Sequence, residues 1–495
     1  MGVFRYIRLV NIAEGLDEAA RHRGDHPAIA FEEQTLTYRE LVGRVRVAAA
    51  ALSRAGIVTG DRVGLLLPNV PEFAVVYHAL VYLGAVAVSI NVMSRPDEVR
   101  HIVADSHAVA IVTTPELLQS IPPRDEIPSV RTVFTGAMEG APIDIPPVEL
   151  EPDSPAAILY TSGTTGKSKG AVLSHGNVIS NVQATRRVVG MRADDVMICF
   201  LPLFHCFGQN FIMNATLYSG ATLVLRRRFV PDDALAACER HGVSMLFGVP
   251  TAYIALLAHP RSHEALRAVR YFFSAAAILP TQVESAWHER TGKHIHEGYG
   301  LTETSPFASY NHTRSWKAGS IGAPIEGVEM RVIDEHDRPL ADGEVGEICI
   351  KGPNVMLGYF RREEDTRRAI VDGWFHSGDI GYRDTEGDYF IVDRVKDMIN
   401  VGGFKVWPRE VEEILFSHAA VRESAVIGVP DDHSGEAVKA FVVVKEGAEV
   451  TGDELATHCR RHLSVYKVPK HFELVAAIPK GATGKVLKKD LRAPK

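Results

Sequence analysis

The sequence predicts an α/β protein: a large N-terminal domain with two stacked α/β units and a β-rich part, followed by a small α+β domain. Three observations predict this fold. Apolar runs typical of buried strands alternate with segments of helical periodicity in two blocks, about residues 25–135 and 155–300. After about residue 315 the chain is richer in glycine and charge and reads as strands joined by turns. Its 495 residues suffice for two or more domains.

In the first block, "DRVGLLLPN" predicts a strand, "PEFAVVYHALVYLG" a helix, "AVAVSIN" a strand, "RPDEVRHIVADS" a helix and "AVAIVTT" a strand. No charged residue occurs between Phe73 and Ser94, a length that could span a bilayer. His78, Ser89, Gly84 and Asn91 interrupt this run, and nothing else in the chain resembles a span. A buried helix that leads into a buried strand is therefore the preferred interpretation.

The second block continues the alternation through "GATLVLRRR", "PDDALAACERHG", "VSMLFGVP", "TAYIALLAH", "RYFFSAA" and "TQVESAWHERTG". The last region contains a helix in "PREVEEILFSH", strands in "ESAVIGVPD" and "AVKAFVVVKEG", a helix in "GDELATHCRRHL" and a strand in "HFELVAAIP". This region is long enough for a small α+β domain.

Composition limits the class of protein. The net charge of −7 and the pI near 6.3 argue against a nucleic-acid partner, because proteins that bind nucleic acids usually carry a surplus of basic residues. The five cysteines are scattered without CxxC spacing, which indicates neither a disulfide framework nor a cysteine zinc site. With no signal peptide or transmembrane segment in view, we expect a cytoplasmic enzyme.

The stretch "YTSGTTGKSKG" (160–170) indicates phosphate binding. Its glycines let the backbone approach an anion, its hydroxyls and amides donate hydrogen bonds, and its lysines supply charge. It is not a Walker A loop, because only Thr164 and Thr165 separate Gly163 from Gly166.

Six motifs together resemble the adenylate-forming superfamily. They are "YTSGTTGKSKGAVLSH", "GYGLTET", "GEICIKGP", "WFHSGDIG", "VDRVKDMINVGGFKVWPREVE" and "PKGATGKVLKKDL", in the order and at roughly the spacings of that superfamily. The likeness extends from "TLTYREL" to Lys485, and within the superfamily the chain most resembles acyl-CoA ligases for fatty or aryl acids.

The resemblance implies an enzyme that joins ATP and a hydrophobic carboxylic acid into an acyl adenylate, and then transfers the acyl group to coenzyme A. The implied cofactor is Mg²⁺, and the partners are small molecules; a homodimer is left open. It also implies an adenylation domain over 1–393 and a mobile domain over 394–495, with Asp393 at the hinge.

The resemblance implies roles for residues that would hold ATP. Thr302 would contact the α-phosphate, Tyr299 would stack on adenine, Asp379 would accept from the ribose hydroxyls with Arg394 as a second contact, and Glu303 with Thr161 would hold Mg²⁺. The remaining implied nucleotide contacts are Ser162, Gly163, Thr164, Thr165, Gly166, Lys167, Ala276, Glu297 and Gly298.

Lys485 resembles the lysine that bridges the carboxylate and the α-phosphate as negative charge builds. In the second half-reaction Gly403 would let the pantetheine of CoA pass closely. His205 would stand at the carboxylate entrance. The acid pocket would draw on "HCFGQNFIMNA", "FGVPTAY", "SAAAILP" and "TSPFAS", which are mostly apolar. Many relatives have "SGAAP" where this chain has "SAAAI", so the length of the acyl channel does not follow from the resemblance.

Alternatives remain at this stage. Within the superfamily, the chain could load a carrier protein instead of CoA, or act as a luciferase-like oxygenase. A P-loop NTPase would release ADP and phosphate where a ligase releases AMP and pyrophosphate. A binding protein without activity is disfavoured because each polar residue that the motifs require is present.

Overall fold

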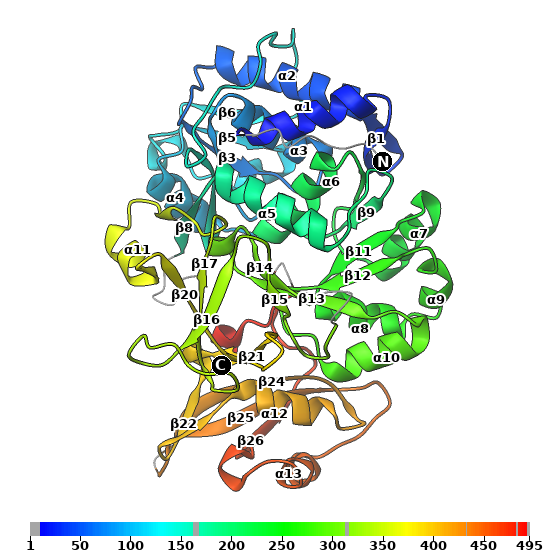
Figure 1. The fold of residues 1–495 in the computed structure, drawn as a ribbon, viewed down its shortest axis with the longest axis vertical. Helices are drawn as coiled ribbons and strands as arrows, with labels where there is room; N and C mark the ends of the chain where they lie inside the picture. Colours follow the sequence, from blue (N-terminus) through cyan, green and yellow to red (C-terminus); the bar gives the residue numbers. More distant parts are fainter. Residues whose placement is uncertain (1–9, 162–167, 312–315, 432, 482–483, 493–495) are drawn as a thin grey trace.

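The computed structural model describes residues 10–161, 168–311, 316–431, 433–481 and 484–492. Figure 1 shows a large domain above a small one. Each has its own hydrophobic core. The main core of the large domain draws on residues 12–389, and that of the small domain on residues 399–463.

The first sheet of the large domain has the order β18-β8-β7-β4-β3-β5-β6. Strands β7, β4, β3, β5 and β6 run parallel, as the βαβ pattern predicts. Its strands are β3 (Arg62–Leu66), β4 (Val86–Ser89), β5 (Ala110–Thr113), β6 (Thr132–Thr135), β7 (Pro155–Thr161), β8 (Lys169–Ser174) and β18 (Gly358–Tyr359). Its sequence segment also supplies α3 (Pro71–Tyr82), α4 (Pro96–Ser106), η1 (Pro115–Ser120) and η2 (Arg124–Glu126).

The second sheet has the order β15-β14-β13-β12-β11-β9-β10-β1-β2. Its strands are β1 (Pro27–Phe31), β2 (Gln34–Thr37), β9 (Val196–Cys199), β10 (Thr222–Leu225), β11 (Met245–Gly248), β12 (Tyr271–Ser274), β13 (Ile295–Gly300), β14 (Phe307–Tyr310) and β15 (Ala323–Pro324). The helices are α1 (Ile12–Arg23), α2 (Tyr38–Arg54), α5 (His175–Val188), the π-helix η3 (Phe207–Met213), α6 (Asn214–Tyr218), α7 (Pro231–His241), α8 (Pro250–Ala258), α9 (Ser262–Ala265), α10 (Thr281–Thr291) and η4 (Thr302–Thr304).

The two sheets exchange strands, so the division into two sequence blocks is wrong in detail. β1 pairs with β10 of the second sheet, and β7 pairs with β4 of the first. Apolar periodicity predicts that a segment is a strand, but the neighbour it pairs with depends on long-range packing that the pattern does not contain.

A third sheet of the large domain is antiparallel, with the order β16-β17-β20-β19 and β21 beside β20. It consists of β16 (Glu329–Ile333), β17 (Gly346–Lys351), β19 (Ile370–Val371), β20 (Trp374–Arg383) and β21 (Tyr389–Arg394), with α11 (Glu363–Ala369) before β19. This is the β-rich part that the change in composition predicts.

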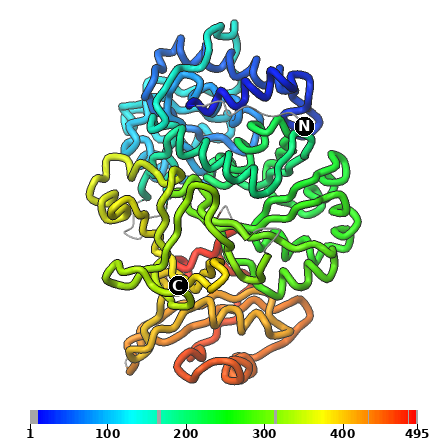
Figure 2. The backbone as a smooth tube through the Cα atoms, viewed as in Figure 1, coloured from blue at the N-terminus to red at the C-terminus, as the bar shows by residue number. Residues whose placement is uncertain are grey.

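The segment that follows β21 carries the core of the small domain. It contains η5 (Val395–Asp397), β22 (Ile399–Val401), β23 (Phe404–Val406), α12 (Pro408–Phe416), β24 (Val421–Asp431), β25 (Gly435–Val444), α13 (Gly452–Arg460), η6 (Val465–Lys467), β26 (His471–Leu474) and α14 (Lys488–Arg492). Figure 2 shows the last, red segment of the chain running back to where the two domains meet.

The uncharged stretch from Phe73 onward is a buried helix followed by a buried strand, as predicted. Pro71 occupies the first turn of α3, where its missing N–H costs nothing, and the chain leaves the helix through Gly84 at φ +69°. Every residue of α3 except Glu72 is buried, against α2 among others. Among the described residues, no helix is both long and apolar enough to cross a membrane.

Candidate active site

The predicted phosphate loop connects β7 and β8, whose antiparallel pairing ends at Thr161 and Lys169. The Thr161 hydroxyl donates to the Lys169 carbonyl at 3.5 Å and closes the base of the hairpin. Lys169 pairs with Asp365 at 2.7 Å. The predicted contacts at Ser162, Gly163, Thr164, Thr165, Gly166 and Lys167 lie outside the described residues.

Asp379 is presented by an irregularity in β20. The register of β17 against β20 shifts between Glu347 and Cys349, and Gly378 turns the chain at φ +70°. The Gly378 amide donates to a carboxylate oxygen of Glu347 at 2.8 Å, and the other oxygen lies 3.3 Å from Nδ1 of His376. The Ser377 hydroxyl accepts the Asp379 amide at 3.0 Å. These contacts hold the bulge that carries Asp379.

Both oxygens of the buried Asp379 carboxylate already accept a hydrogen bond. Arg394 donates through Nε to Oδ1 at 2.6 Å, and the Tyr299 hydroxyl donates to Oδ2 at 2.7 Å. Burial, and then the charge of Asp379, raise the pKa of the Tyr299 phenol, so it keeps its proton and remains a donor. Each carboxylate oxygen has a second acceptor position, which leaves room for two ribose hydroxyls. Stacking of Tyr299 on adenine stays a prediction.

Thr302 and Glu303 lie in the turn η4, which Leu301 separates from the end of β13. Glu303 is 8% exposed, and one of its oxygens accepts from the Tyr359 hydroxyl at 2.9 Å. Burial, and then Glu303, raise the pKa of Tyr359, which therefore remains a donor. Mg²⁺ bound with a nucleotide commonly takes one or two carboxylates and completes its shell with phosphate and water. A single carboxylate held by a neutral donor fits that ion.

Lys485 lies against the large domain because Gly484, the residue before it, packs closely on Thr251. A Cβ added at Gly484 (φ +76°) would lie 2.8 Å from Oγ1 of Thr251, in the segment after β11. The Lys485 side chain keeps some contact with solvent, but much protein lies around its amine. Desolvation by this protein, and then the charge of Arg394, lower the pKa of the amine to about 8, while the charge of Asp379 opposes the shift. The structure thus brings the last motif of the chain to the residues that hold Asp379.

His205 belongs to the same group. Burial, and then the charge of Lys485, lower its pKa to about 4, so the imidazole is neutral near pH 7. Nδ1 accepts the Phe207 amide at 3.4 Å, which assigns the proton to Nε2. A neutral Nε2–H donor beside a lysine can bind a carboxylate oxygen.

Three further predicted nucleotide contacts lie on or beside the neighbouring strands β12 and β13. Ala276 follows β12 with φ +69°, a conformation that non-glycine residues seldom adopt. Burial raises the pKa of Glu297 to about 8, with Arg409 opposing it. Gly298 makes room for a ring, because a Cβ there would lie 2.3 Å from Cζ of Phe273. Their contacts with nucleotide stay predictions.

Gly403 lies apart from these residues. It is exposed at φ +91°, its amide donates to the side-chain oxygen of Asn400 at 2.9 Å, and a Cβ there would meet nothing within 4 Å. Phe404 beside it is 59% exposed. In this arrangement of the domains Gly403 does not join the site.

Asp393 joins the two domains. One oxygen accepts the amide of Arg394 at 2.7 Å, and the other accepts the amide of Arg409, in the first turn of α12, at 2.8 Å. Burial raises the pKa of this carboxyl, and nearby Lys488 opposes the shift. The residue therefore ties the last strand of the large domain to the first long helix of the small one.

The sequence interpretation missed Tyr359, which donates to Glu303, and it missed Glu347 and Thr251, which lie against the chain neighbours of Asp379 and Lys485. Glu347 stands inside the quoted motif "GEICIKGP", so its place in a motif was a usable signal. Thr251 stands inside "FGVPTAY", a segment expected at the acid pocket, but its approach to Gly484 carried no signal. Neither did the contact of Tyr359 with Glu303, because both contacts join segments far apart in the sequence.

Two clusters of metal-binding side chain types occur among the described residues, and neither contains a predicted metal ligand. Glu347, Cys349 and His376 form one, and their contacts serve the bulge of β20. Asp384, Glu386 and Asp388 form the other, around the ammonium group of Lys317. Protein contacts account for both clusters without an ion.

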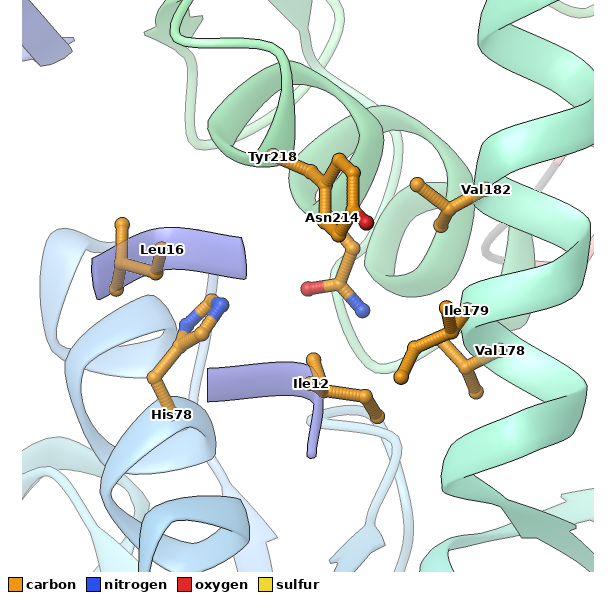
Figure 3. A pocket seen from close by; sticks show the side chains of 8 residues that line it. All are labelled: Ile12, Leu16, His78, Val178, Ile179, Val182, Asn214 and Tyr218. Carbon is orange, nitrogen blue, oxygen red and sulfur yellow. The ribbon is translucent and has the colours of Figure 1, made fainter. Parts of the chain in front are cut away.

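Figure 3 shows an interior cavity with room for roughly one water molecule. Asn214 points its amide into the cavity near His78, and Oδ1 of Asn214 has no partner among the described residues. Burial lowers the pKa of His78 to about 4, and Nδ1 of its ring contacts the Ala74 carbonyl at 2.8 Å. None of the eight lining residues is a predicted nucleotide, metal or catalytic residue, and only Asn214 belongs to a segment expected at the acid pocket. We interpret the cavity as a packing defect suited to one water.

Comparison with known proteins finds similarity along most of the chain. The model of the AMP-binding enzyme family matches residues 16–360, and that of the AMP-binding enzyme C-terminal domain matches residues 410–485. A feruloyl-CoA synthase from Amycolatopsis is 38% identical, over 94% of this chain and 95% of the relative. A long-chain-fatty-acid–CoA ligase from Salmonella typhimurium is 34% identical, over 98% of this chain and 94% of the relative.

A solved structure agrees with these relatives. The crystal structure of an anthranilate CoA ligase in complex with anthranoyl-AMP superposes with a TM-score of 0.93 at 28% identity, and the match covers 99% of this chain and 98% of that one. The predicted α/β fold, with its large N-terminal and small C-terminal domains, is confirmed.

Proposed function

Because the chain belongs to the AMP-binding enzyme family and is an ATP-dependent, AMP-forming acyl-CoA ligase, we propose that the residues gathered around Asp379 carry out both of its half-reactions on a hydrophobic carboxylic acid. The observation that carries this proposal is the convergence of Lys485 with Arg394, Asp379 and His205. These groups come from both domains, and together they offer an acceptor for ribose and cations for two anions.

In the first half-reaction an oxygen of the acid's carboxylate attacks the α-phosphorus of ATP, the bond to the bridging oxygen breaks, and pyrophosphate leaves. The two reactants repel each other, so the site must supply positive charge where they meet. Lys485 bridges them, Thr302 contacts the α-phosphate, and Nε2–H of His205 orients the carboxylate. Glu303 and Thr161 would hold Mg²⁺, which neutralises phosphate charge.

In the second half-reaction the thiol of CoA attacks the acyl carbon, a thioester forms, and AMP leaves with the electron pair of the broken C–O bond. The thiol loses its proton to solvent. We assign the boundary between residues 393 and 394 to a hinge at Asp393, about which the small domain turns. The exposure of Gly403 supports this assignment, because that glycine must travel to reach CoA.

The names of the relatives support a hydrophobic acid, since they mention long-chain fatty, feruloyl and anthranilate substrates for those proteins. We place the enzyme in the cytoplasm, and its five buried, unpaired cysteines support a reducing compartment. A homodimer stays a prediction, which light scattering on the purified protein would test.

The test is Lys485→Ala, assayed in both half-reactions. ATP–pyrophosphate exchange should fall about 100- to 1,000-fold, the usual loss when one transition-state contact is removed. Thioester formation from supplied acyl-AMP and CoA should stay within about threefold. Lys489→Ala, which changes an exposed lysine four residues away, serves as the control.

Equal loss in both half-reactions would refute the assignment of Lys485. Product analysis tests the activity itself, because AMP and pyrophosphate are expected where an NTPase would yield ADP and phosphate. Activity with a phosphopantetheinyl carrier protein, but none with free CoA, would favour a carrier-loading enzyme.

A further inference from the structure

The segments expected to surround the acid pack instead into a cluster of aromatic rings. Strands β11, β12 and β14 and the π-helix η3 each contribute to it. None of its side chains is more than 4% exposed, and its members are Phe207, Phe211, Phe247, Tyr271, Phe273, Phe307 and Tyr310.

Three of these rings form a closed triangle. The centroids of Phe207 and Phe307 are 5.4 Å apart, those of Phe273 and Phe307 5.4 Å, and those of Phe207 and Phe273 6.1 Å, all edge-to-face. A fourth ring, that of Phe211, also packs against Phe307, with 5.1 Å between the ring centroids. Rings at these spacings are in contact, so an alkyl chain can pass between them only if they move apart.

The triangle adjoins the reacting groups on two sides. The Phe207 amide contacts Nδ1 of His205 at 3.4 Å. Phe307 directly follows Pro306, whose carbonyl accepts the Leu301 amide at 2.9 Å at the start of the Thr302 turn. An acid whose carboxylate lies between His205 and Thr302 therefore meets these rings with its other end.

We propose that Phe207, Phe273 and Phe307 close the inner end of the acid site, so that the enzyme activates short aliphatic or single-ring aryl acids and discriminates against long-chain fatty acids. This inference rests on the proposed function and names its substrate class. Pocket size selects acids because an interior packed at crystal-like density accepts extra methylenes only with strain.

The experiment compares hexanoate, benzoate and palmitate with the wild type, with ATP, Mg²⁺ and CoA present, and measures AMP and thioester. The expected kcat/KM for palmitate is at least about 100-fold below that of the better small acid. Phe307→Ala should raise the ratio of palmitate to hexanoate kcat/KM about tenfold or more, because it opens the triangle.

Phe272→Leu is the matched control. Phe272 precedes Phe273 on β12 but packs against Trp287, at 5.0 Å, on the opposite face of the strand. Its loss should leave the ratio of palmitate to hexanoate unchanged. If Phe307→Ala does not fold, Phe307→Val and Phe207→Leu make the same comparison with a smaller change in volume.

A wild-type kcat/KM for palmitate equal to that of the better small acid would overturn the inference and leave the proposed function intact. An unchanged ratio in a folded, active Phe307 variant would do the same. Failure of all acids to yield AMP and pyrophosphate would instead overturn the proposed function, and with it the inference.

Discussion

Replacing Tyr299 by phenylalanine tests how the ribose acceptor is held. The substitution removes only the hydroxyl that donates to Oδ2 of Asp379 at 2.7 Å, inside the protein. A hydrogen bond to a charged group contributes about 1.5–3 kcal/mol, which corresponds to roughly 10- to 150-fold in a binding constant. The lower end is expected here, because Arg394 continues to orient Oδ1.

The expected result is a rise of about tenfold in the KM for ATP, with kcat within about threefold, since the ribose contact is made equally in the ground and transition states. ATP–pyrophosphate exchange at saturating acid measures both constants. Tyr382→Phe is the control: it lies on the same strand as Asp379, its ring stacks on Phe390, and its hydroxyl makes no hydrogen bond to other described residues. A KM for ATP within twofold of wild type would show that the Tyr299 contact does not orient the carboxylate.

Three further predictions follow from the same geometry. Gly484→Ala should slow adenylation about fivefold to tenfold and spare thioester formation from acyl-AMP, because the new Cβ meets Thr251 and the backbone is strained at positive φ. Gly447→Ala is the control, because Gly447 also has a positive φ but a Cβ there would meet nothing within 4 Å. The kcat/KM for adenylation should fall above about pH 8, because the lowered pKa of Lys485 lets its amine lose the positive charge there. Glu297 also has a pKa of about 8, so Glu297→Gln is the control, and its kcat/KM should still fall above pH 8. A kcat/KM that stays constant from pH 7 to 9 would contradict the role of the Lys485 cation. Glu347→Ala should raise the KM for ATP about fivefold with little change in kcat, because the bulge that presents Asp379 loses the contacts of Glu347 with Gly378 and His376. The control Glu344→Ala changes an exposed residue and should leave the KM unchanged. An unchanged KM for Glu347→Ala would show that the Glu347 carboxylate does not position Asp379.

Local sequence signals predicted the elements of the fold well, and pairing less well. The helix from Pro71 and the strand from Val86 follow from apolar runs with a proline at one end and a glycine between them. The sheet that β1 joins could not be predicted in this way. Its partner β10 lies about 190 residues away, and no feature of residues 27–31 specifies that neighbour.

The site shows the same division. Motifs predicted roles for Asp379, Arg394 and Lys485 individually, because each stands in a recognisable string. They did not predict that Tyr299 would bind Asp379 through its hydroxyl, since that bond joins β13 to β20 across 80 residues of sequence. The packed rings behind His205 were also unforeseen, because an apolar composition predicts a hydrophobic pocket and a filled core equally well.

The charges around Lys485 give the proposed rotation a direction. Arg394 and Lys396 oppose the charged amine, whereas Asp379 and Asp397 favour it. ATP adds several negative charges beside these groups, so its binding should stabilise the arrangement in which Lys485 is docked. When pyrophosphate leaves, most of that negative charge leaves with it, and the repulsion among the cations returns. The departure of pyrophosphate, a product of the first half-reaction, therefore favours the release of Lys485 that the second half-reaction requires.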